Sequence, residues 1–416
     1  LMLHALVLRG HGPAAGLAAV AVWGIVVESD RRAPPRVPVV VGIFVATFLA
    51  AVLRREVVLL TLAVAAVLVT RAIRDRRVSP VLLGATPAVA AAVAFVSDRV
   101  AVRQIFGHQR SLPTSGSDQD YLFSRLDSFA SLFQPGYEDA STLALALAVV
   151  AAAVTVAAAT RFVIVGNPRE LLAGTTLAAA VLVGRLLLAP PDMVPGIVAA
   201  FPIGVAGLIL ATRGIRGAPL PSELGASLAV FVALVVLTQY STSGAWEWGS
   251  RYLAVGFVLA LPIAAVGLLR TWDLVPPGRL RASLVSTATA VAVLPLVMGL
   301  LAQRDARINN EANVTAAHEL ATATGTDLVV STNPAVPRTD TSQIDGAVRW
   351  LWAWPNELAP LLGRLEDAGV DEVAFSSREP VIAAEYLSPL GWEIEDLRAQ
   401  RANPGTQYLG LLRQVD

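Results

Sequence analysis

Long apolar runs limit how this chain can fold more than any other feature of it. The runs are about 17–22 residues long, the length that an α-helix needs to cross the hydrocarbon core of a bilayer. The sequence therefore predicts an α-helical polytopic membrane protein with about 10 transmembrane helices. The predicted spans lie at residues 12–28, 37–53, 57–70, 79–97, 140–160, 170–189, 194–212, 224–240, 252–269 and 283–302.

Composition supports this class and excludes several others. The chain is 55% hydrophobic and only 15% charged, whereas a soluble protein of 416 residues would carry far more charge. Its net charge is zero, so the chain has no overall positive charge that would attract it to nucleic acid. Cysteine is absent, which excludes disulfides and thiolate metal sites, and the four histidines are scattered without ligand spacing. The sequence indicates no cofactor and no metal site, and leaves the use of a divalent metal open.

Arginines gather in alternate connections between the predicted spans. Cytoplasmic loops carry excess positive charge, so these connections are placed inside the cell. The opposite connections, including 97–139 and 241–251, hold fewer arginines for their length and are placed outside. One short outer connection, LRRE from Leu53 to Glu56, breaks the rule with two arginines. It is either a functional site or the sign of a miscounted span.

The chain changes character after about Gln303. Residues 1–302 form the predicted multi-spanning domain, with an outer loop at 97–139, and residues 303–416 form a predicted extracytoplasmic α/β domain. This second domain has no glycine-rich phosphate loop and no acid–base–nucleophile set, so we expect a cap or recognition element. Its predicted strands are 327–331, 371–377, 392–397 and 408–415, and its predicted helices are 310–323 and 356–369.

Aromatic side chains crowd into one outer connection, STSGAWEWGSRYLAVG at 241–256. Trp246, Trp248 and Tyr252 can stack on a sugar ring or hold a polyprenyl chain. The alternative is the aromatic belt that many membrane proteins carry at the interface.

Charged side chains stand beside these aromatics and in the LRRE turn. Arg54, Arg55 and Arg251 lie at predicted outer helix ends, where a lipid phosphate would lie, and arginine binds phosphate oxygens with two parallel hydrogen bonds. Snorkelling to water is the alternative for Arg54 and Arg55. For Arg251 the alternative is a structural pair with Glu247, four residues earlier.

Three stretches together resemble GT-C type membrane glycosyltransferases, which use polyprenyl-phosphate sugars and include mannosyl- and arabinosyltransferases. WEWGSRYLAVGFVLALP, Trp246 to Pro262, is similar to the family's Trp-Gly-x-Arg-Tyr stretch at the outer mouth of a late helix. LAAVLRREVVLL, Leu49 to Leu60, is similar to a helix that ends in a basic residue at the outer surface, with Glu56 where proline is frequent. SLFQPGYEDASTLAL, Ser131 to Leu145, is similar to an outer stretch that enters a helix but lacks its Gly-Leu.

The resemblance also implies a catalytic carboxylate in the first outer loop, after the first helix. No such loop precedes Gly12, so we expect an N-terminally truncated chain whose catalytic carboxylate lies upstream of Leu1. The other outer carboxylates that can act as a base are Glu56, Asp98, Asp118, Asp120 and Glu247.

The resemblance implies a membrane glycosyltransferase that moves a sugar from a polyprenyl-phosphate donor to an extracytoplasmic lipid, glycan or protein acceptor. Its location would be a bacterial plasma membrane, which the arginine-only basic residues and the Ala/Val/Gly/Pro richness also suggest. The substrate-binding residues would be Arg54, Arg55, Glu56, Trp246, Glu247, Trp248, Arg251 and Tyr252. A polytopic transporter or lipid-carrier flippase and a catalytically inactive scaffold are the alternatives. A transporter should show mid-span ionisable residues, repeated halves or broken helices.

Overall fold

A computed structural model describes most of the chain. The described residues are 11–29, 31, 33–106, 141–189, 196–214, 222–238, 251–332, 348–353, 357–377, 387, 391–401 and 406–414. By internal contacts the chain divides into two compact units. The first, called the helical unit, comprises Leu1–Gly136, Thr142–Pro190 and Val194–Gly299; the second, called the sheet unit, comprises Leu300–Asp416 with Tyr137–Ser141 and Pro191–Met193.

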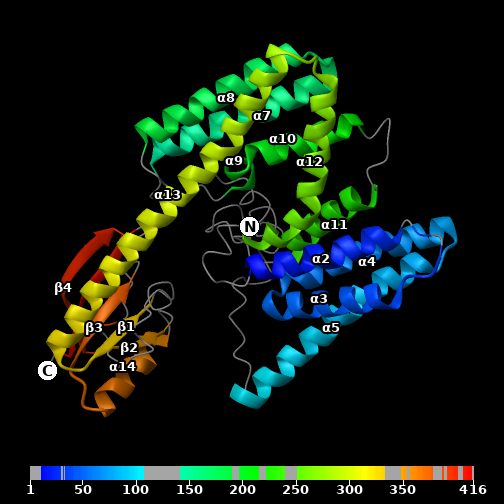
Figure 1. Ribbon diagram of the computed structural model, residues 1–416. Coiled ribbons are helices and arrows are strands. Elements are labelled where there is room, and N and C mark those ends of the chain that lie inside the picture. Colours follow the sequence, from blue (N-terminus) through cyan, green and yellow to red (C-terminus); the bar gives the residue numbers. More distant parts are fainter. Residues whose placement is uncertain are drawn as a thin grey trace. The chain divides into compact units, whose positions relative to one another are not determined.

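Eight of the ten predicted spans each lie on one α-helix, whereas the span 194–212 is divided between two α-helices and the span 252–269 between a 3₁₀ helix and an α-helix (Figure 1). The helices are α2 (His11–Ser29), α3 (Val37–Leu53), α4 (Glu56–Asp75), α5 (Ser79–Phe106), α7 (Thr142–Val165), α8 (Pro168–Leu188), α9 (Ile197–Ala200), α10 (Pro202–Gly214), α11 (Ser222–Thr238), the 3₁₀ helix η2 (Arg251–Gly256), α12 (Phe257–Leu274) and α13 (Arg279–Thr324). Among the described residues, 7 helices are long and apolar enough to cross a membrane, and α3, α10 and α11 are shorter apolar helices. The mainly helical architecture, with apolar helices of membrane-spanning length, is confirmed, whereas about 10 crossings stays a prediction.

Small residues let the helices of the helical unit pack closely. Helices α2, α3, α4 and α5 lie side by side, α11 packs on α4, and α7 pairs with α8 (Figure 1). The shared core of α2 to α5 contains many fully buried alanines, among them Ala14, Ala50 and Ala63. Since lipid tails are as apolar as leucine, close van der Waals packing between small residues stabilises such helix pairs.

The closest contact of this kind joins α10 and α12. A Cβ atom added at Gly267 would lie 2.0 Å from the carbonyl oxygen of Gly207 and 2.6 Å from the amide nitrogen of Ala211. A Cβ at Gly207 would lie 2.7 Å from the carbonyl oxygen of Ala264. Only glycine fits at both positions, because the two backbones come so close. Gly207 faces Ala264 and Ala211 faces Gly267, so residue numbers rise together along the two helices, which therefore run in the same direction.

A buried carboxylate closes the turn between α2 and α3. Glu28 is fully buried, and its Oε1 accepts a hydrogen bond from Arg36 Nε at 2.6 Å. The backbone N–H of Arg36, which precedes α3, donates to Glu28 Oε2 at 3.0 Å, and Arg31 pairs with the same carboxylate at 3.4 Å. Two arginines thus pair with one buried carboxylate at the end of a helical hairpin.

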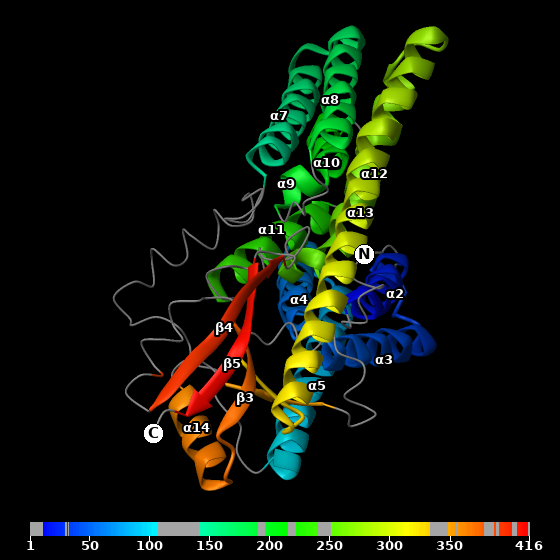
Figure 2. The same ribbon diagram turned by 90° about the vertical axis from the view of Figure 1, so that its left-hand side faces the viewer.

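The sheet unit contains a five-stranded mixed sheet (Figure 2). The strands are β1 (Leu328–Ser331), β2 (Arg349–Trp352), β3 (Glu372–Ser377), β4 (Trp392–Arg401) and β5 (Thr406–Gln414), in the order β2-β1-β3-β5-β4. β1 is parallel to β2 and to β3, whereas β5 is antiparallel to β3 and β4.

One helix covers each face of this sheet. Val330, Phe375 and Leu412 pack with α14 (Leu358–Asp367) on one face. Val329, Ala374 and Leu409 pack on the other face with Ala317 and Ala321, which lie in the last part of α13. The alternation along each strand follows from the period of two that side chains have in a β-strand.

Two features of this region were not predicted from the sequence. Residues 310–323 are helical as predicted, but they belong to the same 46-residue helix, α13, as the predicted span 283–302. The polar stretch between them has no glycine or other stop signal, so the helix continues. Strand β2 was not predicted, because its four residues RWLW are too short to show a clear period.

Candidate functional site

The LRRE turn joins α3 to α4 with only two residues outside the helices. α3 ends at Leu53, and the backbone N–H of Arg54 caps it by donating to the Ala50 carbonyl at 2.9 Å. Arg54 is extended, Arg55 has helical angles, and Glu56 is the first residue of α4. Three consecutive charged residues are thus held at one end of the α3–α4 hairpin.

Arg54 and Glu56 form a two-pronged ion pair within this turn. Arg54 Nη2 lies 2.7 Å from Glu56 Oε1, and Arg54 Nε lies 3.1 Å from Glu56 Oε2. The Glu56 side chain is 6% exposed and that of Arg54 is 20% exposed. Glu56 therefore occupies the Nε and Nη2 edge of the guanidinium, and the Arg54 side chain keeps a fifth of its surface exposed.

Arg55 pairs with a different helix. Its Nη2 lies 3.1 Å from Asp98 Oδ2 of α5, and both side chains are exposed, at 66% and 37%. Because exposed ion pairs contribute little to stability, this contact orients the two side chains more than it holds the fold. The structure thus brings together two arginines and two carboxylates, of which Asp98 had been considered only as a base.

Residues 251–256, from the WEWGSRYLAVGFVLALP stretch, lie in the same part of the helical unit as the LRRE turn. Arg251 and Tyr252 begin η2, whose backbone is described although these two side chains are not. Leu253 and Val255 of η2 are buried in one hydrophobic cluster that also contains Ala51 of α3 and Val57 of α4. η2 also packs directly against α2, α4 and α11. The LRRE turn and the start of η2 therefore border a common core.

A close contact fixes how η2 leads into α12. A Cβ atom at Gly256 would lie 2.6 Å from Cε1 of Phe231, a fully buried side chain of α11. Glycine is needed here for space, because its backbone angles of φ −66° and ψ −18° suit any residue. The Phe231 ring therefore lies directly against the backbone at Gly256, the last residue of the segment that begins with Arg251.

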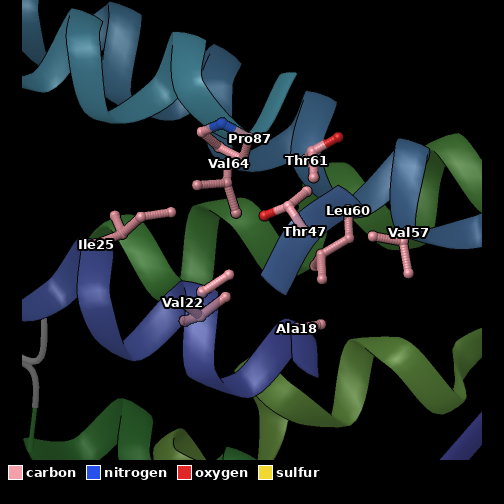
Figure 3. A pocket seen from close by; sticks show the side chains of 10 residues that line it. Ala18, Val22, Ile25, Thr47, Val57, Leu60, Thr61, Val64 and Pro87 are labelled. Atoms are coloured by element: carbon pink, nitrogen blue, oxygen red, sulfur yellow. The ribbon is translucent and has the colours of Figure 1, made fainter. Parts of the chain in front are cut away.

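A small apolar cavity lies between α2, α3, α4 and α5, in the bundle that carries the LRRE turn (Figure 3). Its volume is about 10 Å³ and its walls include Val22, Ile25, Leu60 and Val64. Thr47 of α3 points its hydroxyl into this space, is 1% exposed and makes no hydrogen bond in the structure. The cavity is large enough for about one water molecule and too small for a sugar.

Other predicted site residues lie outside the described part of the chain. These are Trp246, Glu247 and Trp248 of the aromatic connection, and Asp118 and Asp120 of the outer loop. Within the described residues, no three His, Asp or Glu side chains come together as a possible metal site.

Sequence reasoning missed a discontinuity in one predicted span. The run 194–212 is divided into α9 and α10 at Phe201, whose φ of −134° and ψ of 54° are not helical. The Phe201 ring lies 4.9 Å from the ring of Phe257, the first residue of α12, in an edge-to-face contact. The sequence feature that indicates this break is Pro202, because a proline disfavours helical backbone angles in the residue before it. The break and the η2–α12 junction are thus neighbours.

Comparisons of the chain with protein-family models, with curated proteins and with solved structures found no match.

Proposed function

We propose that the protein is a membrane glycosyltransferase that moves a sugar from a polyprenyl-phosphate donor to an extracytoplasmic lipid, glycan or protein. The observation that carries the proposal is the shared core of the LRRE turn and η2. The two segments are nearly 200 residues apart in the sequence. Both carry arginines, and they belong to two of the three stretches on which the resemblance to the GT-C type rests.

The chemistry of the donor explains what such arginines would do. The phosphate of the donor lies at the membrane surface and leaves when the sugar is transferred, so negative charge develops on it in the transition state. Arginine stays charged and stabilises that charge through paired hydrogen bonds. In this proposal Glu56 positions Arg54 by holding its Nε and Nη2 edge, which leaves the remaining N–H groups for phosphate oxygens. Arg251 binds the same phosphate from η2.

The test of this function is the transfer reaction itself. Full-length protein in membranes is given a labelled polyprenyl-phosphate mannose or arabinose, with a membrane extract as the source of acceptor. We expect label to move to acceptor, and Arg251→Lys to lower the rate roughly a hundredfold at equal protein level, since lysine lacks the planar fork. Normal turnover of Arg251→Lys would remove Arg251 from the site, and no transfer by the wild type would end the proposal.

The proposal places the protein in a bacterial plasma membrane with the sheet unit outside the cytoplasm. The arginine-rich connections support this orientation. A reporter that works only in the cytoplasm, fused after Asp416, should be silent, whereas the same reporter placed in the connection at Arg76 and Arg77 should be active. A bright signal from the fusion at Asp416 would reverse the topology.

The second candidate function is transport of a lipid-linked sugar across the membrane. The break at Phe201, beside the start of α12, favours it, because transporter sites are frequently formed where helices are discontinuous. Whether the sugar–phosphate bond of the donor is broken distinguishes the two functions. A flippase would move the intact donor between leaflets of a proteoliposome and leave its sugar–phosphate bond unbroken.

A further inference from the structure

Two turns with arginines lie at one end of the helical unit, the α2–α3 turn and the α4–α5 turn. The parts of the four helices next to these turns pack into one hydrophobic cluster, which contains Ile25, Ile43, Leu68 and Leu83. The two turns therefore share one end of the bundle, and the LRRE turn, at the start of α4, lies at the other end.

Carboxylates hold most of the arginines at this end. Glu28 binds both described arginines of the α2–α3 turn. Near the end of α4, Asp75 pairs with Arg71 at 3.4 Å and with Arg74 at 3.1 Å. Arg71 also lies 3.5 Å from Glu223 of α11. These arginines thus take part in contacts that link neighbouring segments of the helical unit.

Two adjacent arginines in the α4–α5 turn are different. Arg76 and Arg77 follow α4 directly, and both are exposed. Within the part of the chain that the structure describes, neither side chain forms an ion pair or a hydrogen bond. Arg76 is the C-cap of α4 and has left-handed angles, φ 53° and ψ 43°, where glycine or asparagine is more usual. The turn thus presents two positive charges that the fold does not neutralise.

Exposed apolar side chains stand on both sides of this charged stretch. Ile73 is 74% exposed and Val78 is 72% exposed. The turn joins α4 to α5, two helices long and apolar enough to cross a membrane. Apolar side chains this exposed are favourable in contact with lipid, and arginines at a helix end extend to the polar surface of the bilayer. Arg76 and Arg77 therefore lie at the depth of the lipid phosphates.

The LRRE turn at the opposite end of α4 has a different arrangement of charge. There each arginine has a carboxylate partner, Glu56 for Arg54 and Asp98 for Arg55. An anion that approaches the LRRE turn therefore meets carboxylates beside the arginines. An anion that approaches Arg76 and Arg77 meets two guanidinium groups whose N–H donors are not already engaged.

We propose that the α4–α5 turn binds the headgroup of an anionic phospholipid, with Arg76 and Arg77 on its phosphate and its acyl chains along Ile73 and Val78. Arginine binds phosphate oxygens through paired, charge-assisted hydrogen bonds. A zwitterionic lipid has the same phosphate but also carries a cation, which the two arginines repel, so the turn favours an anionic lipid. The site lies at the other end of α4 from the LRRE turn, and it does not depend on the transferase proposal.

The test is lipid binding by purified full-length protein in detergent. The protein is titrated with phosphatidylglycerol or with phosphatidylcholine of the same acyl chains, and native mass spectrometry counts the bound lipids at each concentration. We expect phosphatidylglycerol to bind at least about tenfold more tightly than phosphatidylcholine. An excess of inorganic phosphate should not displace it, because free phosphate has no acyl chains to bury. Arg76→Gln with Arg77→Gln should weaken phosphatidylglycerol binding about twentyfold, since each arginine at an anionic lipid surface contributes roughly a fivefold gain.

Two further variants separate binding at this turn from a general effect of charge or folding. Arg76→Lys with Arg77→Lys keeps both charges and should bind phosphatidylglycerol more tightly than the glutamine variant. Arg364→Gln with Arg398→Gln removes the same charge from exposed positions of α14 and β4 in the sheet unit, and should bind as the wild type does. The proposal is overturned if the wild type binds both lipids equally, if the Arg76/Arg77→Gln variant binds phosphatidylglycerol as well as the wild type, or if inorganic phosphate displaces the lipid.

Discussion

Neutralising Arg54 and Glu56 together, as Arg54→Gln with Glu56→Gln, is expected to lower sugar transfer about a hundredfold while the protein stays folded. The reason is that Arg54 stabilises the charge of the departing phosphate, a contact worth about 3 kcal/mol in a transition state. Replacing both members of the pair matters, because Glu56 is buried. Arg54→Gln alone would leave that carboxylate uncompensated and is expected to cost about 3–5 kcal/mol of stability.

The control for this double variant lies at the other end of the same helix. Arg74 pairs with its neighbour Asp75 at 3.1 Å, with side chains 69% and 30% exposed. Arg74→Gln with Asp75→Asn likewise removes one positive and one negative charge and should leave transfer within about twofold of the wild type. Transfer rates at equal protein level and melting temperatures in detergent are the measurements. Full activity in the Arg54/Glu56 variant would exclude Arg54 from the donor site.

Gly267→Ala is expected to destabilise the helical unit strongly. The new methyl group would lie 2.0 Å from the carbonyl oxygen of Gly207 and 2.6 Å from the backbone of Ala211, so the α10 and α12 backbones must separate. Overpacking in a core costs about 1–3 kcal/mol when side chains can shift, and more is expected here because the clash is with backbone. Loss of the monodisperse peak in size-exclusion chromatography and a lower melting temperature are the readouts.

Gly184→Ala provides the comparison for that variant. Gly184 lies in α8, and a Cβ atom there would meet nothing within 4 Å. Because alanine favours helix over glycine by about 1 kcal/mol, Gly184→Ala should be neutral or slightly stabilising. If Gly267→Ala were as stable as Gly184→Ala, the close crossing of α10 and α12 would be wrong.

The site was less predictable from sequence than the helices. Arginine bias singled out LRRE as an exception to the topology rule, and the turn does hold three charged residues between two helices. The partners of these arginines were not predicted. Asp98 is 43 residues from Arg55, and no local pattern links residues that far apart.

The sequence by itself determined where the helices of the membrane-type unit lie. A run of apolar residues satisfies its own backbone hydrogen bonds as a helix whatever surrounds it, so composition over about 20 residues suffices. It also determined four of the five strands of the C-terminal sheet, of which β1 and β3 are short runs buried on both faces. Only the tertiary structure decided that η2 borders the core beside the LRRE turn, that α10 and α12 meet through Gly207 and Gly267, and that Ser331, Ser376 and Gln407 align. Each of these depends on packing between segments that are distant in the chain, where complementary shape, and not local periodicity, selects the partner.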